Sequence, residues 1–512
     1  MDNPREGKNP VNINPENLRF IMGFKLKRFR LEKGLSLSEL AEKTNLSVSY
    51  LSEIEKGKKY PKPEKILQLA QSLGVPFDDL VSLQVSREAD LLPVILSSPV
   101  IKEFPFRMYG VSPQDLLALI TGDTEKAGAL IRTFLEIGRD YDMRVEHLLF
   151  AALRSYQQMH LNYFEEIENA AAEFAAGNGW TNNPAIPAES LRHFLEEQHR
   201  CRIDEDTLQN YPELQEVRSV WIDGKTPKLL IKSALLPAQK AFIFAREIGY
   251  RCLELKERTP VFPSAAMGSF EQLLNDFKAS YFAGALLLNR DLLCRDFETF
   301  FKRHRWDGSA FLALIERYGV TPKTFLYRLS QLLPQFFGLR DIFFFRINNP
   351  AGGERYHLVR MFNMSRMAIP NGIGMREHYC RRWMAIKLLK NLGEQRSNPP
   401  NTTLIAAQRS RFLDSGVEVF SITLAGSSPL EKGVNLSGTV SFIVNEHFKK
   451  TVGFWDDPAI PRAEVNETCE RCGLSEEACR DRAVPPSIHQ KQQEQKNRDK
   501  ILNQLIQNLK QS

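Results

Sequence analysis

A short stretch near the N-terminus, GLSLSELAEKTNLSVSYLSEIEKG at residues 34–57, constrains the fold more than any other part of the chain. Ser36 and Glu39 have the spacing of a capping box, which predicts that a helix begins there. Asn45 follows this helix, and Asn tolerates the left-handed conformation that a tight turn requires. The stretch therefore predicts a helix that ends in a sharp turn.

A second helix follows the turn directly. Ser47 is a cap-type residue, and Leu51 and Ile54, three positions apart, form the buried stripe of that helix. Two helices joined in this way make a helix-turn-helix pattern, whose second helix enters the major groove of DNA. The residues that we expect to contact DNA are Ser36, Ser47, Ser49, Tyr50, Ser52, Glu53, Lys56, Lys58 and Lys59.

The charge of the chain is concentrated around this pattern. Residues 24–62 contain ten Lys or Arg and five Asp or Glu, a balance of +5, against a net charge of +6 for the whole chain. Basic residues at this position suit the neutralisation of phosphates. The alternative is a small helical bundle with a solvated basic face.

The stretch resembles the Cro and lambda-repressor type of helix-turn-helix domain over about 55 residues. The matching residues are Leu26, Phe29, Arg30, Gly34, Leu35, Ser36, Leu40, Ala41, Leu46, Ser47, Leu51, Ile54, Glu55, Gly57, Pro61, Leu67 and Leu80. The resemblance implies a five-helix DNA-binding domain that acts as a dimer. Leu37 departs from the pattern, because the family usually has a phosphate-contacting Gln there.

Length and composition indicate a soluble protein of about two to four domains. The chain has 512 residues, 43% of them hydrophobic and 25% charged. It contains no apolar run long enough to span a membrane, and its polar N-terminus lacks the apolar core of a signal peptide. We therefore expect a cytoplasmic protein without a membrane partner.

The pattern of apolar spacing and turn residues predicts a mainly α, multidomain chain with an α+β C-terminal domain. We expect strands at 228–232, 341–347, 357–362, 417–424 and 438–444. The expected parts are a flexible arm at 1–19, the helix-turn-helix domain at 20–82, a linker at 83–112, a helical region at 113–185, a degenerate peptidase-like domain at 186–335, a ligand or metal domain at 336–486 and a polar helical tail at 487–512.

The degenerate domain is identified from a run that lacks two histidines. Zinc peptidases carry His-Glu-x-x-His on a helix, where two imidazoles four residues apart hold the metal and the Glu activates water. Here the run reads Arg246-Glu247-Ile248-Gly249-Tyr250, and Arg cannot ligate zinc. The framing residues resemble the ImmA/IrrE metallopeptidases, with Asp276 near the place of a third ligand. We expect a scaffold without hydrolysis, hence no enzyme and no catalytic residue.

Three of the seven cysteines are clustered, at Cys469, Cys472 and Cys479. The C-x2-C spacing lets two thiolates hold one metal ion from a tight turn. Cys380 is the best candidate for a fourth ligand, and His378 is the alternative. Such a set suits zinc or an iron–sulfur cluster, and the spacing does not distinguish them. The other interpretation is reduced cysteines without a metal.

These features in this order resemble the short-chain fatty acyl regulators of bacteria. The resemblance is carried by the helix-turn-helix domain, the run 242–253, the run 277–288, residues 340–348, the run Cys380-Arg-Arg-Trp383 and the cysteine cluster. It implies a transcription factor that senses acyl-CoA, and some members of the family are thought to hold an iron–sulfur cluster near these cysteines.

The residue types needed to hold an acyl-CoA are cations beside an aromatic cavity. The candidates are Arg346, Arg360, Arg381, Arg382 and Trp383. The alternative for each is a structural role, in a core strand or as a surface charge. Three functions therefore compete: a regulator that responds to acyl-CoA, a metal or redox sensor that uses the cysteines, and a metallopeptidase-type regulator.

Overall fold

The computed structural model describes residues 15–81, 145–263, 268–350, 353–365, 377–394, 403–428, 431 and 433–511. The chain forms two compact units, Met1–Ala152 and Leu153–Ser512. None of the helices in the described ranges combines the length and the apolar character that crossing a membrane requires.

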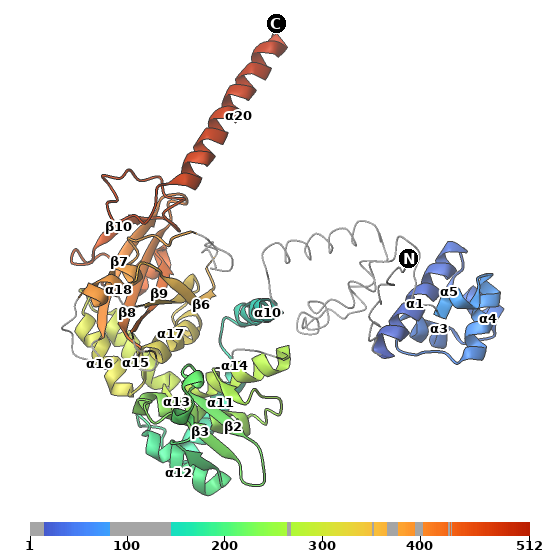
Figure 1. The fold of residues 1–512 in the computed structure, drawn as a ribbon, viewed down its shortest axis with the longest axis horizontal. Helices are drawn as coiled ribbons and strands as arrows, with labels where there is room; N and C mark the ends of the chain where they lie inside the picture. The colour runs from blue at the N-terminus through green and yellow to red at the C-terminus, as the bar shows by residue number, and fades with distance from the viewer. Residues whose placement is uncertain are drawn as a thin grey trace, which may run out of the picture. The chain divides into compact units, whose positions relative to one another are not determined.

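Five helices form the N-terminal head (Figure 1): α1 (Pro15–Glu32), α2 (Leu37–Thr44), α3 (Val48–Glu55), α4 (Pro63–Leu73) and α5 (Phe77–Val81). Their apolar faces enclose one core, whose fully buried members include Leu26, Leu40, Leu51, Ile54 and Leu69. Gly23 lets α1 approach α3 closely, because a Cβ at this position would lie 2.2 Å from the carbonyl oxygen of Ile54. The prediction of a five-helix head is confirmed.

The middle of the chain combines helices with a small sheet. The helices are α10 (Val145–Met159), α11 (Glu165–Gly177), α12 (Ala188–His199), α13 (Pro237–Cys252) and α14 (Phe270–Leu287). The strands are β1 (Arg202–Asp204), β2 (Ser219–Ile222), β3 (Lys228–Ile231) and β4 (Val261–Phe262), in the order β1-β3-β2-β4. Helices α13 and α14 pack tightly, since a Cβ at Gly249 would lie 2.9 Å from the ring of Phe282.

Three further helices connect this region to the C-terminal sheet: α15 (Arg290–Phe301), α16 (Gly308–Tyr318) and α17 (Pro322–Phe336). A buried ion pair ties α17 to α11, because Arg328 donates to both carboxylate oxygens of Glu168, at 2.6 and 2.8 Å. The hydroxyl of Tyr281 on α14 donates to the same carboxylate at 2.7 Å. Helices α11, α14 and α17 are thus joined through the buried carboxylate of Glu168.

The C-terminal sheet has six strands in the order β10-β7-β8-β9-β5-β6 (Figure 1). Its elements are β5 (Ile342–Pro350), β6 (His357–Asn363), α18 (Met384–Glu394), β7 (Leu404–Phe412), β8 (Glu418–Ser427), β9 (Val434–Ile443), α19 (Glu446–Thr451) and β10 (Arg462–Val465). Side chains alternate along β5: Phe344 meets Tyr327 of α17, and Phe345 meets Trp383 beside α18. The two helices therefore cover opposite faces of the sheet. The chain continues into α20 (Ser487–Gln511).

All five expected strands are present, as β3, β5, β6, β8 and β9, but the long strand β7 was not predicted. Its sequence, LIAAQRSRF, breaks the apolar alternation because Gln408 and Arg409 are buried with polar partners. Gln408 accepts from the backbone N–H of Met384 at 2.9 Å, and Arg409 pairs with Glu418. The mixed fold class with an α+β C-terminal domain is confirmed.

Only some of the predicted domain limits fall within the described residues. Helix α1 begins at Pro15, so the expected start of the head at residue 20 is too late. The rest of the expected arm, at 1–14, lies outside the described residues, as do the linker at 83–112 and the segment 113–144 of the helical region.

Candidate DNA interface and ligand sites

The caps predicted for the two helices of the motif are present. The Ser36 hydroxyl accepts from the backbone N–H of Glu39 at 3.1 Å, and the Glu39 carboxylate accepts from the N–H of Ser36 at 2.7 Å. This backbone hydrogen bond lowers the pKa of the Glu39 carboxyl. Asn45 has φ 47°, and Ser47 accepts from the N–H of Tyr50 at 3.1 Å. The turn and both caps therefore follow the sequence pattern.

Helix α3 presents the expected face. Leu51 and Ile54 are fully buried, whereas Ser49 and Lys56 are exposed and Tyr50 is half-buried. The exposure of these side chains suits a helix that enters a groove. Ser36, Ser47, Lys58 and Lys59 are exposed too, whereas Ser52 and Glu53 are half-buried.

Two lysines lie over the Tyr50 ring, and only Lys59 is among the residues that we expected to contact DNA. The ammonium of Lys65 lies 4.3 Å from the ring centroid and that of Lys59 lies 5.6 Å from it. Lys59 also forms an ion pair of 2.7 Å with Glu53, and this hydrogen bond lowers the pKa of the Glu53 carboxyl. Lys65, on α4, adds a cation beside the expected interface.

Two of the ten cations in the basic stretch are buried, which corrects the expectation that they all neutralise phosphates. Arg30 is 7% exposed and holds Glu55 through two hydrogen bonds, of 2.6 and 3.0 Å. Its Nη1 also donates to the carbonyl of Leu35 at 2.7 Å. Lys25 is 3% exposed, and burial lowers its pKa. Both residues support the head from inside.

The degenerate peptidase run forms a buried charge network on α13. Arg246 is 1% exposed and bonds Asp276 of α14 and the Glu247 carboxylate, the latter at 3.0 Å. Tyr250 donates to Asp276 at 2.9 Å, and Arg258 pairs with Glu247 at 2.7 Å. Asp276 therefore lies beside both positions where the histidines are missing. The guanidinium of Arg246 fills the space between these acids, so this donor set does not fit a catalytic zinc ion.

Comparison with known proteins places the motif in a family. Residues 26–80 match the family described as Helix-turn-helix. Over 66 residues the chain is 36% identical to an uncharacterized HTH-type transcriptional regulator, y4dJ, from Sinorhizobium fredii, a match that covers 13% of this chain and 86% of that protein. The chain belongs to the helix-turn-helix transcriptional regulators.

The similarity of this regulator to known proteins extends beyond the head. Residues 196–330 match the family described as IrrE N-terminal-like domain. The regulator is 24% identical over 364 residues to the propionyl-CoA carboxylase regulator of Cereibacter sphaeroides, across 67% of this chain and 72% of that one. A solved transcriptional regulator of Mycobacterium tuberculosis is 18% identical, over 66% of this chain and 94% of its own. Its TM-score of 0.45 is too low to establish a shared fold.

The four cysteines predicted as ligands gather in one place in the regulator. A β-bridge between Tyr379 and Thr468 joins the segments of Cys380 and Cys469. Burial raises the pKa of the Cys380 thiol to about 11, and the nearby Cys469 and Cys472 also raise it. Burial likewise raises the pKa of Cys479, with the same two neighbours contributing. The thiols are therefore close enough to influence one another.

Within the described ranges, no group of three or more His, Cys, Asp or Glu residues is placed to hold a metal ion. His378, the alternative ligand, has its Nδ1 2.9 Å from a carboxylate oxygen of Glu470. The donor types suit zinc or an iron–sulfur cluster, and metal binding by them stays a prediction.

The structure separates the predicted ligand residues into three places. Arg346 and Arg360 are paired across β5 and β6. Arg381 donates to the carbonyl of Glu354 at 2.8 Å and covers the ring of Tyr356 at 4.5 Å. Arg382 donates to the carbonyl of Ala478 at 3.4 Å, in the loop between the clustered cysteines. Only Arg346 and Arg360 come together.

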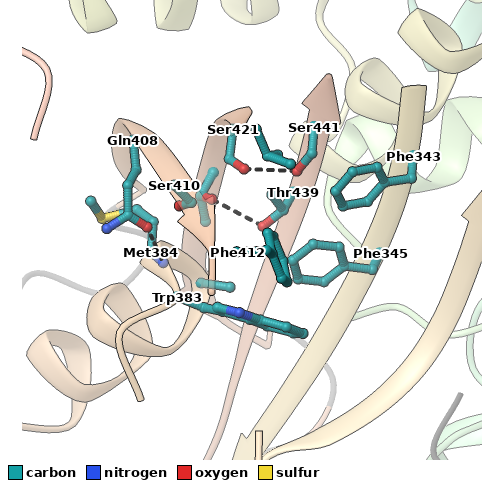
Figure 2. Close-up of a pocket in the computed structure, with 13 residues that line it drawn as sticks. Phe343, Phe345, Trp383, Met384, Gln408, Ser410, Phe412, Ser421, Thr439 and Ser441 are labelled. Carbon is teal, nitrogen blue, oxygen red and sulfur yellow. Dashed lines mark hydrogen bonds between the residues drawn. The ribbon is translucent and has the colours of Figure 1, made fainter. Parts of the chain in front are cut away.

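Trp383 lines a pocket on the α18 face of the sheet, with Phe343 and Phe345 (Figure 2). Hydroxyl pairs form one side of it: Ser421 with Ser441 at 2.8 Å, and Thr423 with Thr439 at 3.0 Å. The cavity volume is about 30 Å³, which is room for about two water molecules. The pocket in this form is too small for an acyl-CoA.

Proposed function

We propose that this DNA-binding transcriptional regulator responds to a short-chain acyl-CoA bound in its second unit. The observation that carries the proposal is the paired position of Arg346 and Arg360, two cations that suit the phosphates of such a ligand. The name of the relative from Cereibacter sphaeroides, a propionyl-CoA carboxylase regulator, supports the same class of effector.

Calorimetric titration of the anaerobically purified protein with acetyl-CoA, propionyl-CoA and free coenzyme A tests the proposal. We expect binding that depends on the acyl group, and a change in affinity for the operator when the ligand is present. Thermodynamic linkage then requires that operator DNA changes the affinity for the ligand by the same factor. Absence of binding by all three compounds would exclude an acyl-CoA effector.

A second candidate function is a metal or redox sensor. The observation that favours it is the gathering of four buried thiols, Cys380, Cys469, Cys472 and Cys479. Metal analysis of anaerobically prepared protein should find zinc or iron, and C469S or C472S should abolish regulation while the fold survives. Protein that carries neither metal would rule out the metal sensor, and unchanged regulation in C469S and C472S would rule out the cysteine site as a sensor of either kind.

The peptidase-like domain acts as a scaffold in this proposal, and the regulator has no hydrolytic activity of its own. Arg246 and Tyr250 replace the two imidazoles that a zinc peptidase needs, and Arg246 instead neutralises Glu247 and Asp276. Zinc-dependent proteolysis by the purified protein would contradict this assignment.

A further inference from the structure

Four cations meet where α17 lies against the edge of the C-terminal sheet. Arg346 and Arg360 are directly opposite on neighbouring strands, a position in which like charges repel. The guanidinium of Arg360 covers the ring of Tyr327 on α17, at 4.7 Å. Lys323, in the first turn of the same helix, and Arg218, just before β2, lie close enough for their charges to act on this pair and on each other. We call these four residues the cation cluster.

Among the described residues, Glu431 is the acid that acts on the cation cluster. Burial lowers the pKa of Arg346 to about 10, Arg218 and Arg360 lower it further, and Glu431 opposes them. Burial lowers the pKa of Lys323 well below its ordinary value, and the three arginines add to this effect. Among the described residues, none of the four forms an ion pair, and the buried Nε of Arg346 has no hydrogen-bond partner. The cluster thus has a net charge of about +3 at neutral pH when Lys323 is protonated.

The repulsion within the cluster is a cost to the folded chain that a bound anion removes. Helix α17 also favours a bound anion, because the N-terminus of a helix attracts negative charge and Lys323 lies in the first turn of this helix. Arg218, Lys323 and Arg346 are half-buried, and Arg360 is exposed. A small anion can therefore enter among these residues, whereas a wide, rigid polyanion such as duplex DNA contacts only the outermost.

We infer that Arg218, Lys323, Arg346 and Arg360 form a binding site for a small molecule that carries adjacent phosphates. Arginine forks hold phosphate oxygens through paired hydrogen bonds, and lysine supplies a compact charge. The charge of about +3 with Lys323 protonated, the form that a bound anion favours, matches a diphosphate better than a single carboxylate. The identification of this anion with the diphosphate of an acyl-CoA rests on the proposed function, whereas the anion site itself does not.

The cation cluster and the pocket of Trp383 are separate features. Phe345 and Arg346 are adjacent on β5, so their side chains leave the sheet on opposite faces. Phe345 faces Trp383, and Arg346 lies on the side of α17. The anion site is therefore independent of the small pocket shown in Figure 2.

Titration of the full-length protein with inorganic pyrophosphate, and separately with propionyl-CoA, tests the site. The variants are K323M and R346Q/R360Q. The matched controls are K450M and R462Q/K450M, which remove the same charges from exposed positions on α19 and β10. We expect the cluster variants to weaken pyrophosphate binding at least about tenfold per cation removed, and the controls to leave it nearly unchanged.

The outcomes distinguish this inference from the proposed function. If the cluster variants lose binding of both pyrophosphate and propionyl-CoA while the control variants keep it, the anion site and the proposed function are both supported. Pyrophosphate binding that needs the cluster, without any binding of propionyl-CoA, supports the anion site and removes the acyl-CoA effector. Propionyl-CoA binding that survives in R346Q/R360Q overturns the anion site for this effector. An acyl-CoA effector would then stand, but without the part that the proposed function gives to Arg346 and Arg360. Equal binding of pyrophosphate by cluster and control variants overturns the site.

Discussion

Lys323 shows how a residue can weaken the fold at a ligand site. Its charge is opposed by burial and by Arg346, Arg218 and Arg360, and Glu431 faces two of these arginines. Active and binding sites commonly keep such unfavourable groups because function requires them.

Replacing this lysine should therefore stabilise the protein in the absence of ligand. K323M removes a buried charge and three repulsions, so we expect the melting temperature of the second unit to rise by about 2 °C or more. Calorimetry in phosphate-free buffer measures this melting temperature, with K450M as the control. A lower melting temperature in K323M would contradict the repulsion described above.

The same lysine predicts a pH dependence of a definite sign. Its pKa is lowered in the folded chain, whereas the unfolded chain has the ordinary value of 10.5, so the unfolded state binds more protons between the two values. Stability should therefore rise with pH as the solution passes through the folded pKa and towards 10.5, and K323M should flatten that rise. Denaturant unfolding of both proteins across this range measures the difference.

Arg246 illustrates the opposite case, a buried charge with two carboxylate partners, Glu247 and Asp276. R246M leaves Asp276 buried without its cation, which should cost about 3–5 kcal/mol of unfolding free energy. The variant R246M/D276L removes both partners and should be less destabilised than the sum of its single variants. Urea unfolding of the wild type, R246M, D276L and R246M/D276L gives this coupling energy. Strictly additive changes in unfolding free energy would show that Arg246 and Asp276 do not act as a pair.

At the scale of the element, α3 separates residues that hold the helix from residues that are free to contact DNA. Ser47 caps the helix, and Leu51 and Ile54 anchor it. Ser49 is exposed and takes no part in the cap, so its replacement tests recognition without disturbing the fold.

We expect S49A and Y50A to weaken binding to an operator selected from random DNA, by about tenfold for Y50A. Y50A removes the ring on which Lys59 and Lys65 rest, so both the expected contact of residue 50 with DNA and the position of the two lysines change. Fluorescence anisotropy measures affinity, with the exposed Ser38 of α2 replaced by alanine as a control and thermal unfolding as a check of the head. Unchanged affinity in both variants would contradict the assigned face.

At the scale of the whole molecule, a paired operator needs two heads, and we propose that the regulator is a homodimer. Helix α20 exposes an apolar stripe, with Ile501 65% and Leu505 53% exposed. Such a stripe on a polar helix suits pairing with the same helix of a second copy.

Sedimentation velocity tests this role of α20. L505D places a charge in the stripe and should shift the protein from dimer to monomer, whereas Q504D alters the adjacent polar position and should not. A dimer that persists in L505D would place the contact elsewhere, and a monomeric wild type would contradict the homodimer itself.

The sequence alone determined the features that depend on neighbouring residues. The caps at Ser36 and Ser47 and the turn at Asn45 follow from interactions over three or four positions, so the head could be predicted in detail. The loss of both zinc-binding histidines, at Arg246 and Tyr250, is equally plain from the sequence.

Only the tertiary structure decided which distant residues meet. Lys25 and Arg30 lie in a basic stretch, but the packing of α1 against the other helices of the head buries them. Strand β7 escaped prediction because its buried polar residues find their partners on other elements, at Met384 and Glu418. The cation cluster joins Arg218, Lys323 and the pair of β5 and β6 from four separate segments. Local pattern cannot show such meetings, because their geometry depends on how sheets and helices pack over long sequence distances.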